Sequence, residues 1–89
     1  MKIMAVCGSG LGSSFMLEMN IKKVLKKLNI DADVEHSDLG SVTPDVADVF
    51  VMASDIASSA NLPAQKLIVV NNIIDMALLE NKIREYFDK

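Results

Sequence analysis

Four short segments with the composition of β-strands constrain the fold of this chain more than any other feature. Residues 3–6, 49–53 and 66–70 are largely continuous apolar runs, whereas residues 32–36 alternate apolar and polar side chains. A continuous apolar run is typical of a strand buried on both faces, and alternation is typical of a half-exposed edge strand. The sequence therefore predicts a parallel sheet in which the second strand is the least buried.

Helical segments separate these strands. Between Ser14 and Asn29 apolar residues recur at helical spacing, and Glu18 with four lysines fills the opposite, polar face. A last helix is expected to start near Asp75, a good N-cap residue, with Glu80 and Arg84 forming an i,i+4 ion pair. Its apolar face would hold Met76, Leu79, Ile83, Tyr86 and Phe87. A single helical turn near residue 40 and a short helix within residues 54–59 complete the expected elements.

The alternation of strands and helices predicts the α/β class. We expect a three-layer sandwich with a four-stranded parallel sheet, strand order 2-1-3-4, and helices on both faces. The 89 residues fit one domain, residues 1–89. In this order the chain reverses direction between the first and third strands, and open α/β sheets bind ligands at such a point, beyond the carboxyl ends of the strands. Residues 7–14 and 54–57 meet there.

Composition excludes several classes of function. The 9 Lys and Arg residues against 12 Asp and Glu residues give a net charge of −3, and the absence of Trp leaves little aromatic surface, so nucleic acid is not an expected partner. One cysteine cannot form an intramolecular disulfide or a Cys-rich metal cluster, and we expect neither a metal nor a cofactor. No stretch approaches the ~20 apolar residues of a membrane span. We therefore predict a cytoplasmic protein without direct membrane insertion.

The chemistry of this chain is concentrated in one loop, whose residues are Cys7, Gly8, Ser9, Gly10, Leu11, Gly12, Ser13 and Ser14. Glycines allow the backbone to wrap around the start of the following helix, because they reach positive φ without a Cβ clash. Amides that point inward, together with the positive end of the helix dipole, form an anion site about the size of one phosphate. The hydroxyls of Ser13 and Ser14 add donors. The same field favours the thiolate of Cys7, which is the nucleophilic form.

Other interpretations of this glycine-rich loop differ in how well they fit. A Walker A loop ends in Gly-Lys-Ser/Thr, but no lysine lies between Ile3 and Lys22, so nucleotide hydrolysis is excluded. The G-x-G-x-G spacing departs from the G-x-G-x-x-G dinucleotide fingerprint, which leaves a dinucleotide- or anion-binding module as an alternative. A cysteine-dependent phosphatase uses C-x5-R-S/T, and here Ser13 occupies the arginine position. A phosphatase-like hydrolase and a buried, inert cysteine also remain open.

Three further features have a structural and a functional interpretation. Asp55 is expected to be a helix N-cap, with action on a leaving group as the alternative. His36 is expected to be a solvated strand residue, since its distance from Cys7 predicts no Cys-His dyad. The six methionines are expected to fill the core, with an apolar rim for partner docking at Phe15 and Met16 as the alternative.

Cys7 at the end of the first strand, the loop Gly8–Ser14 and the length of the chain resemble the cytoplasmic IIB component of the bacterial sugar phosphotransferase system (PTS). The motif C-G-x-G-x-G-S-S most resembles the ascorbate-specific branch of the lactose/cellobiose-type IIB fold. Only residues 3–17 are specific for this resemblance. The resemblance implies that a phosphohistidine on the IIA protein donates to Cys7. The phosphocysteine would then donate to a sugar, here L-ascorbate, held by the membrane IIC permease. A loop without an arginine clamp suits a carrier that holds its phosphoryl group until handover.

Overall fold

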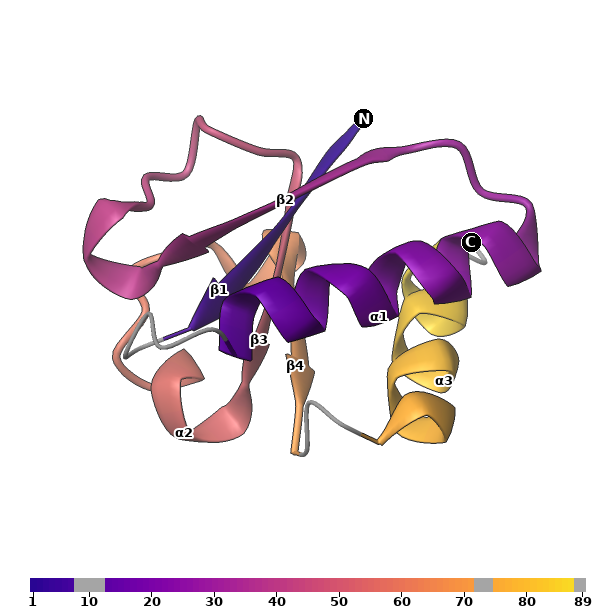
Figure 1. Cartoon of the computed structure of the whole chain (residues 1–89). Helices are drawn as coiled ribbons and strands as arrows, with labels where there is room; N and C mark the ends of the chain where they lie inside the picture. Colours follow the sequence, from indigo (N-terminus) through magenta and orange to yellow (C-terminus); the bar gives the residue numbers. More distant parts are fainter. Residues whose placement is uncertain (8–12, 72–74, 88–89) are drawn as a thin grey trace.

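The four predicted strands form one parallel sheet. The computed structural model describes residues 1–7, 13–71 and 75–87 (Figure 1), without the side chains of Cys7, Ser13 and Ser14. The strand order is β2-β1-β3-β4, which confirms both the α/β class and the predicted order 2-1-3-4. The strands are β1 (Lys2–Cys7), β2 (Asp33–Asp38), β3 (Val49–Ala53) and β4 (Leu67–Val70).

Helices cover both faces of the sheet, as the three-layer prediction requires. α1 (Ser13–Leu28) and α3 (Met76–Phe87) pack on one face, and α2 (Ser54–Ala57) with its neighbouring loops packs on the other. Single 3-10 turns lie at Leu39–Ser41 and Ala64–Lys66, the first of them where one helical turn was predicted. α1 runs across the sheet beside α3 (Figure 1).

The core consists of two clusters separated by the sheet. Ile3 and Ala5 of β1 face α1 and α3, whereas Met4 and Val6 enter the cluster on the α2 face. Phe50, fully buried, is the largest member of that second cluster. Because successive residues of a central strand enter both clusters, β1 and β3 need an apolar residue at nearly every position. This requirement explains the continuous apolar runs in the sequence.

The prediction that the methionines fill the core is wrong for most of them. Met4 and Met52 are buried, at 6% and 0% exposure. The other four are exposed: Met1, Met16, Met19 and Met76. Met76 was also expected on the buried face of the last helix, where Leu79 and Ile83 are indeed buried. It lies in the first turn of α3, at the end of the helix, where the core no longer covers it.

Asp75 caps α3 as predicted. Its Oδ1 accepts a hydrogen bond from the Leu78 N–H at 3.1 Å, and its carbonyl accepts one from the Leu79 N–H at 3.0 Å. Replacing Asp75 by alanine leaves the first of these donors without its acceptor, so we expect the free energy of unfolding to fall by about 1 kcal/mol. Urea denaturation measures this loss. Asp75→Asn retains an acceptor and should lose less than half as much; equal losses would contradict a capping role.

Candidate functional site

The backbone places Cys7 where the sequence predicted it. Cys7 is the last residue of β1, a central strand, and pairs in register with Asp38, the last residue of β2. The predicted cradle residues Gly8, Ser9, Gly10, Leu11 and Gly12 lie outside the described residues. Ser13 and Ser14 form the first turn of α1, and their side chains, like that of Cys7, lie outside the description. The framework around the loop is thus described, whereas the cradle itself remains a prediction.

The amino end of α1 is the positive element of this framework. α1 has 16 residues, with no acidic residue in its first turn and with Lys26 and Lys27 in its last turn. The first four amides of a helix have no acceptor within it, and the aligned peptide dipoles place partial positive charge there. No carboxylate in the first turn cancels that charge. A site at the start of α1 therefore attracts an anion.

Segments that follow the other strands surround the end of β1. β3 pairs with β1, Val6 lying opposite Met52, and α2 begins directly after β3. In Figure 1, α2 and the first turn of α1 lie at the same end of the sheet, towards which the strands point. The two loops that were predicted to meet at this end therefore follow neighbouring strands. Asp38 also lies at this end of the sheet, because β2 extends two residues beyond His36, where the strand was predicted to end. The position of Asp38 near Cys7 was therefore not predicted from the sequence.

Asp55 is not the N-cap of α2, and that prediction is wrong. The N-cap position is Ala53, with no side-chain hydrogen bond, and Asp55 lies one residue inside the helix. The helix starts at Ser54, immediately after the strand, so Asp55 comes too late in the chain to cap it. Its side chain is exposed at the carboxyl end of the sheet. Its action on a leaving group remains a prediction.

Apolar side chains border the start of α1 on the outside. Phe15, Met16 and Met19 are 52%, 50% and 44% exposed. Phe15 touches the His36 ring edge to face, with ring centroids 5.7 Å apart. Exposed large apolar residues that lie together mark surfaces that contact other molecules. The alternative interpretation of Phe15 and Met16 as an apolar rim fits their exposure, and their role as core filler does not.

His36 and Glu18 form a contact that the sequence analysis did not foresee. His36 Nδ1 donates a hydrogen bond to Glu18 Oε1, and Lys22 Nζ lies 2.7 Å from Glu18 Oε2. Glu18 was expected on the polar face of its helix, but it is only 8% exposed. The Glu18 side chain points towards β2, where the hydrogen bond from His36 offsets the cost of burying the carboxylate. His36 is therefore not simply solvated, although its side chain remains 46% exposed.

The Glu18 carboxyl gives the stability of this protein a dependence on acid. Burial raises its pKa, but the hydrogen bonds and charges of Lys22 and His36 together outweigh burial, so the pKa lies below its ordinary value of 4.5. A depressed folded-state pKa contributes stability that is present above the pKa of the unfolded chain and is lost as pH falls through the folded value. Loss of this contribution begins near pH 4.5 and continues below it.

Replacing Glu18 by glutamine should lower the free energy of unfolding at neutral pH by about 1–2 kcal/mol, because the charge-assisted hydrogen bonds are lost from a buried position. The variant should also lose less of its remaining stability below pH 4.5 than the original chain. Urea denaturation at a series of pH values measures both effects. Glu35→Gln is the control, because Glu35 forms an exposed ion pair with Lys2 worth less than about 1 kcal/mol. Parallel stability curves for the original chain and Glu18→Gln would contradict the assignment.

The described part of this site is the framework of an α/β protein in which a cysteine ends a central strand ahead of the first helix. Within the described residues, no group of three or more His, Cys, Asp or Glu side chains is arranged to hold a metal ion. Among the helices in the described ranges, none has both the length and the apolar character needed to cross a membrane.

Comparison with known proteins identifies the class. Residues 2–85 match the family described as "PTS system, Lactose/Cellobiose specific IIB subunit". The chain belongs to this family of phosphotransferase-system IIB proteins, which confirms the resemblance seen in its sequence and gives it a role in sugar phosphotransfer.

Several curated relatives carry a more specific name. The ascorbate-specific PTS system EIIB component of Mycoplasma pneumoniae is 30% identical over 90 residues, covering 98% of this chain and 90% of that protein. The proteins with the same name from Salmonella choleraesuis and Escherichia coli O157:H7 are each 31% identical over 87 residues. These two alignments cover 94% of this chain and 86% of each relative. The likeness therefore extends over nearly the whole length of all these chains.

Proposed function

We propose that this chain is a phosphoryl carrier in which Cys7 receives a phosphoryl group from the phosphohistidine of a IIA protein and passes it to a sugar bound by a membrane IIC permease. The observation that carries the proposal is the position of Cys7 at the carboxyl end of a central strand, before the amino end of a 16-residue helix with no acid in its first turn. In this proposal residues 1–89 form one domain, which acts in the cytoplasm. The names of the relatives support L-ascorbate as the sugar.

The first transfer forms a sulfur–phosphorus bond. The Cys7 thiolate attacks phosphorus in line with the phosphohistidine nitrogen, the phosphorus–nitrogen bond breaks, and the imidazole nitrogen leaves with the electron pair. In the second transfer a sugar hydroxyl attacks the same phosphorus, the sulfur–phosphorus bond breaks, and the thiolate is regenerated while the hydroxyl proton is lost. Chemistry of this kind depends on positioning and charge stabilisation rather than on a strong acid.

The proposed cradle supplies that stabilisation through backbone amides and two hydroxyls. Its residues are Gly8, Ser9, Gly10, Leu11, Gly12, Ser13 and Ser14. Amides at a helix start bind the equatorial oxygens in both the resting and the transferring state, without a guanidinium that would favour attack by water. This arrangement supports handover of the group rather than its release.

The proposal is tested by incubating the chain with a phosphorylated IIA protein and measuring intact mass. A carrier gains one phosphoryl group only when the donor is present, and it loses the group again when membranes containing the IIC permease and ascorbate are added. Membranes with a lactose-type permease and lactose serve as the control for the sugar. A cysteine-dependent hydrolase would instead turn over a small aryl phosphate without any protein donor. An inert anion-binding module would show neither reaction.

A further inference from the structure

The two edges of the sheet differ in their chemistry. β2 carries three carboxylates, those of Asp33, Glu35 and Asp38, and only one of its residues is buried. β4 has the sequence Leu-Ile-Val-Val, without a charged or polar side chain. Charged side chains on an edge strand prevent it from pairing with another chain, whereas an uncharged edge leaves its backbone groups open to such pairing. β2 is thus protected by charge, and β4 lacks this protection.

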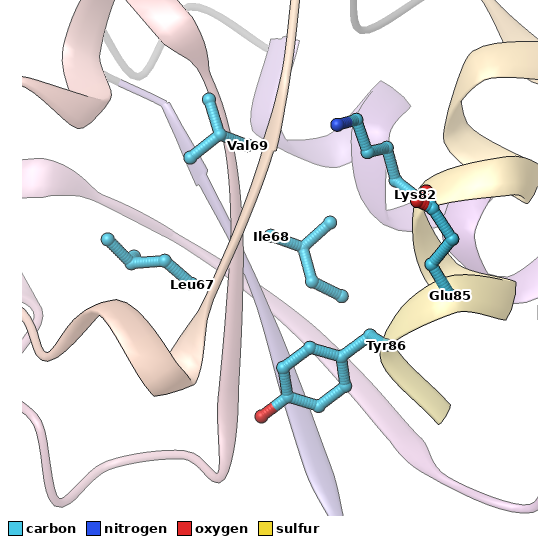
Figure 2. A pocket seen from close by; sticks show the side chains of 6 residues that line it. All are labelled: Leu67, Ile68, Val69, Lys82, Glu85 and Tyr86. Carbon is cyan, nitrogen blue, oxygen red and sulfur yellow. The ribbon is translucent and has the colours of Figure 1, made fainter. Parts of the chain in front are cut away.

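The outer side of β4 is accessible. An open groove of about 340 Å³ lies between β4 and α3, and Figure 2 shows the strand facing the helix across it. Its lining residues are Leu67, Ile68, Val69, Lys82, Glu85 and Tyr86. Three consecutive strand residues line the groove, which means that it exposes the edge of the strand itself. The Leu67 N–H donates a hydrogen bond to the Ala64 carbonyl. Within the described residues, the backbone of β4 forms no other hydrogen bond beyond those that pair it with β3.

The charges of α3 fall into two groups. Glu80 forms ion pairs with Lys27 and Arg84, at 2.9 and 2.6 Å; the first joins α3 to α1, and the second lies within α3. Lys82 and Glu85 are exposed on the groove side and form no ion pair with any described part of the chain. They have opposite charges and are three residues apart, hence about one helical turn. A surface with this pattern is complementary to its own copy turned by a two-fold axis.

We propose that the edge of β4 binds a second copy of this chain. The two β4 strands pair antiparallel about a two-fold axis and join the two sheets into one continuous sheet. Lys82 of each copy then lies opposite Glu85 of the other, and the half-buried side chains of Leu67 and Val69 lose further contact with water. Because the strands of the two copies run in opposite directions, the two Cys7 residues lie at opposite ends of the dimer. Each cysteine remains accessible to other proteins.

The experiment uses charge exchange between two variants. Lys82→Glu places four acidic groups at the two-fold interface, and Glu85→Lys places four basic groups there. Each variant alone should dimerise at least about tenfold more weakly than the original chain, because like charges oppose each other across the axis. An equimolar mixture of the two variants should restore the original dimer affinity, since a Glu-rich copy then faces a Lys-rich copy. Sedimentation velocity over a range of concentrations measures all three samples.

The matched control is Lys23→Glu, which makes the same charge change on the exposed face of α1 and should leave dimerisation unchanged. Circular dichroism confirms that each variant is folded, as expected for substitutions at exposed positions. A chain that sediments as a monomer at every concentration would overturn the proposal, even if a different protein binds to the edge of β4. Dimers that persist unchanged in both single variants, or a mixture that remains monomeric, would overturn it as well.

Discussion

Replacing Cys7 by serine should reduce the rate of phosphoryl transfer from a phosphorylated IIA protein by about a thousandfold or more. A thiol near the amino end of a helix is readily ionised, whereas a serine hydroxyl remains protonated at neutral pH unless a base removes its proton. His36 is the single histidine of the chain, and it is hydrogen-bonded to Glu18. We therefore do not expect His36 to remove the proton of a serine at position 7. The phosphorylated variant should therefore be undetectable by intact mass on the time scale on which the original chain is fully phosphorylated.

A matched variant separates the nucleophile from its surroundings. Ser14→Ala removes one hydroxyl while leaving the helix amides in place, so we expect transfer to slow by about tenfold, the effect of one modest hydrogen bond. Urea denaturation should show that Cys7→Ser loses little stability. If instead Cys7→Ser accepts phosphoryl groups normally but unfolds much more readily, the cysteine is a structural core residue and the carrier proposal is wrong.

Replacing Phe50 by alanine should destabilise the fold by about 3–5 kcal/mol, the largest effect we expect from a single side chain in the core. Phe50 is fully buried and is the largest residue of the cluster on the α2 face, whose other buried members are Met4, Val6, Ala47 and Met52. This cluster is small, and its cover consists of a four-residue helix and loops. Total stabilities of small domains are about 5–15 kcal/mol, so the variant should be partly unfolded at physiological temperature.

Urea denaturation of Phe50→Ala, with Ile83→Val as control, measures this effect. Ile83 of α3 is equally buried, but the control removes a single methylene and should cost about 0.5–1.5 kcal/mol. A loss below about 1 kcal/mol for Phe50→Ala would mean that the loops on the α2 face collapse into the vacated space. That result would contradict the view of this face as a fixed third layer.

The sheet could be predicted from the sequence because its two central strands are buried on both faces. That burial requires the continuous apolar runs at residues 3–6 and 49–53, and the structure extends β1 by one residue at each end and leaves β3 unchanged. The predicted order of the strands is also confirmed, since short right-handed connections leave few arrangements open. The end of β2 was misjudged because Ser37 and Asp38 carry no strand signal of their own. They are held in the strand by pairing with Val6 and Cys7.

Contacts between distant segments could not be predicted in the same way. Glu18 has the spacing of an ordinary surface partner for Lys22, and only the packing of α1 against β2 brings His36 to its other oxygen. The exposure of Met16 and Met19 likewise depends on which part of α1 the sheet covers. In both cases the decisive information is the position of a helix relative to a strand far away in the sequence.

The position of Cys7, the candidate nucleophile, could be predicted from the sequence, but only some of the residues around it could be. A cysteine between an apolar run and a glycine cluster must lie at the end of a strand, and Cys7 does. Asp38 was missed because it reaches the site only through the additional length of β2. Asp55 was correctly placed after the third strand but was given the wrong role, since the helix begins immediately after the strand.

The central position of β1 affects when this protein can fold during its synthesis. β1 leaves the ribosome before the other three strands, but its neighbours in the sheet are residues 33–38 and 49–52. Until β3 has emerged, α1 has only a two-stranded sheet to cover, and small sheets of that kind are marginally stable. Native structure therefore forms late in translation, and until then the apolar residues of β1 and α1 are exposed to chaperones.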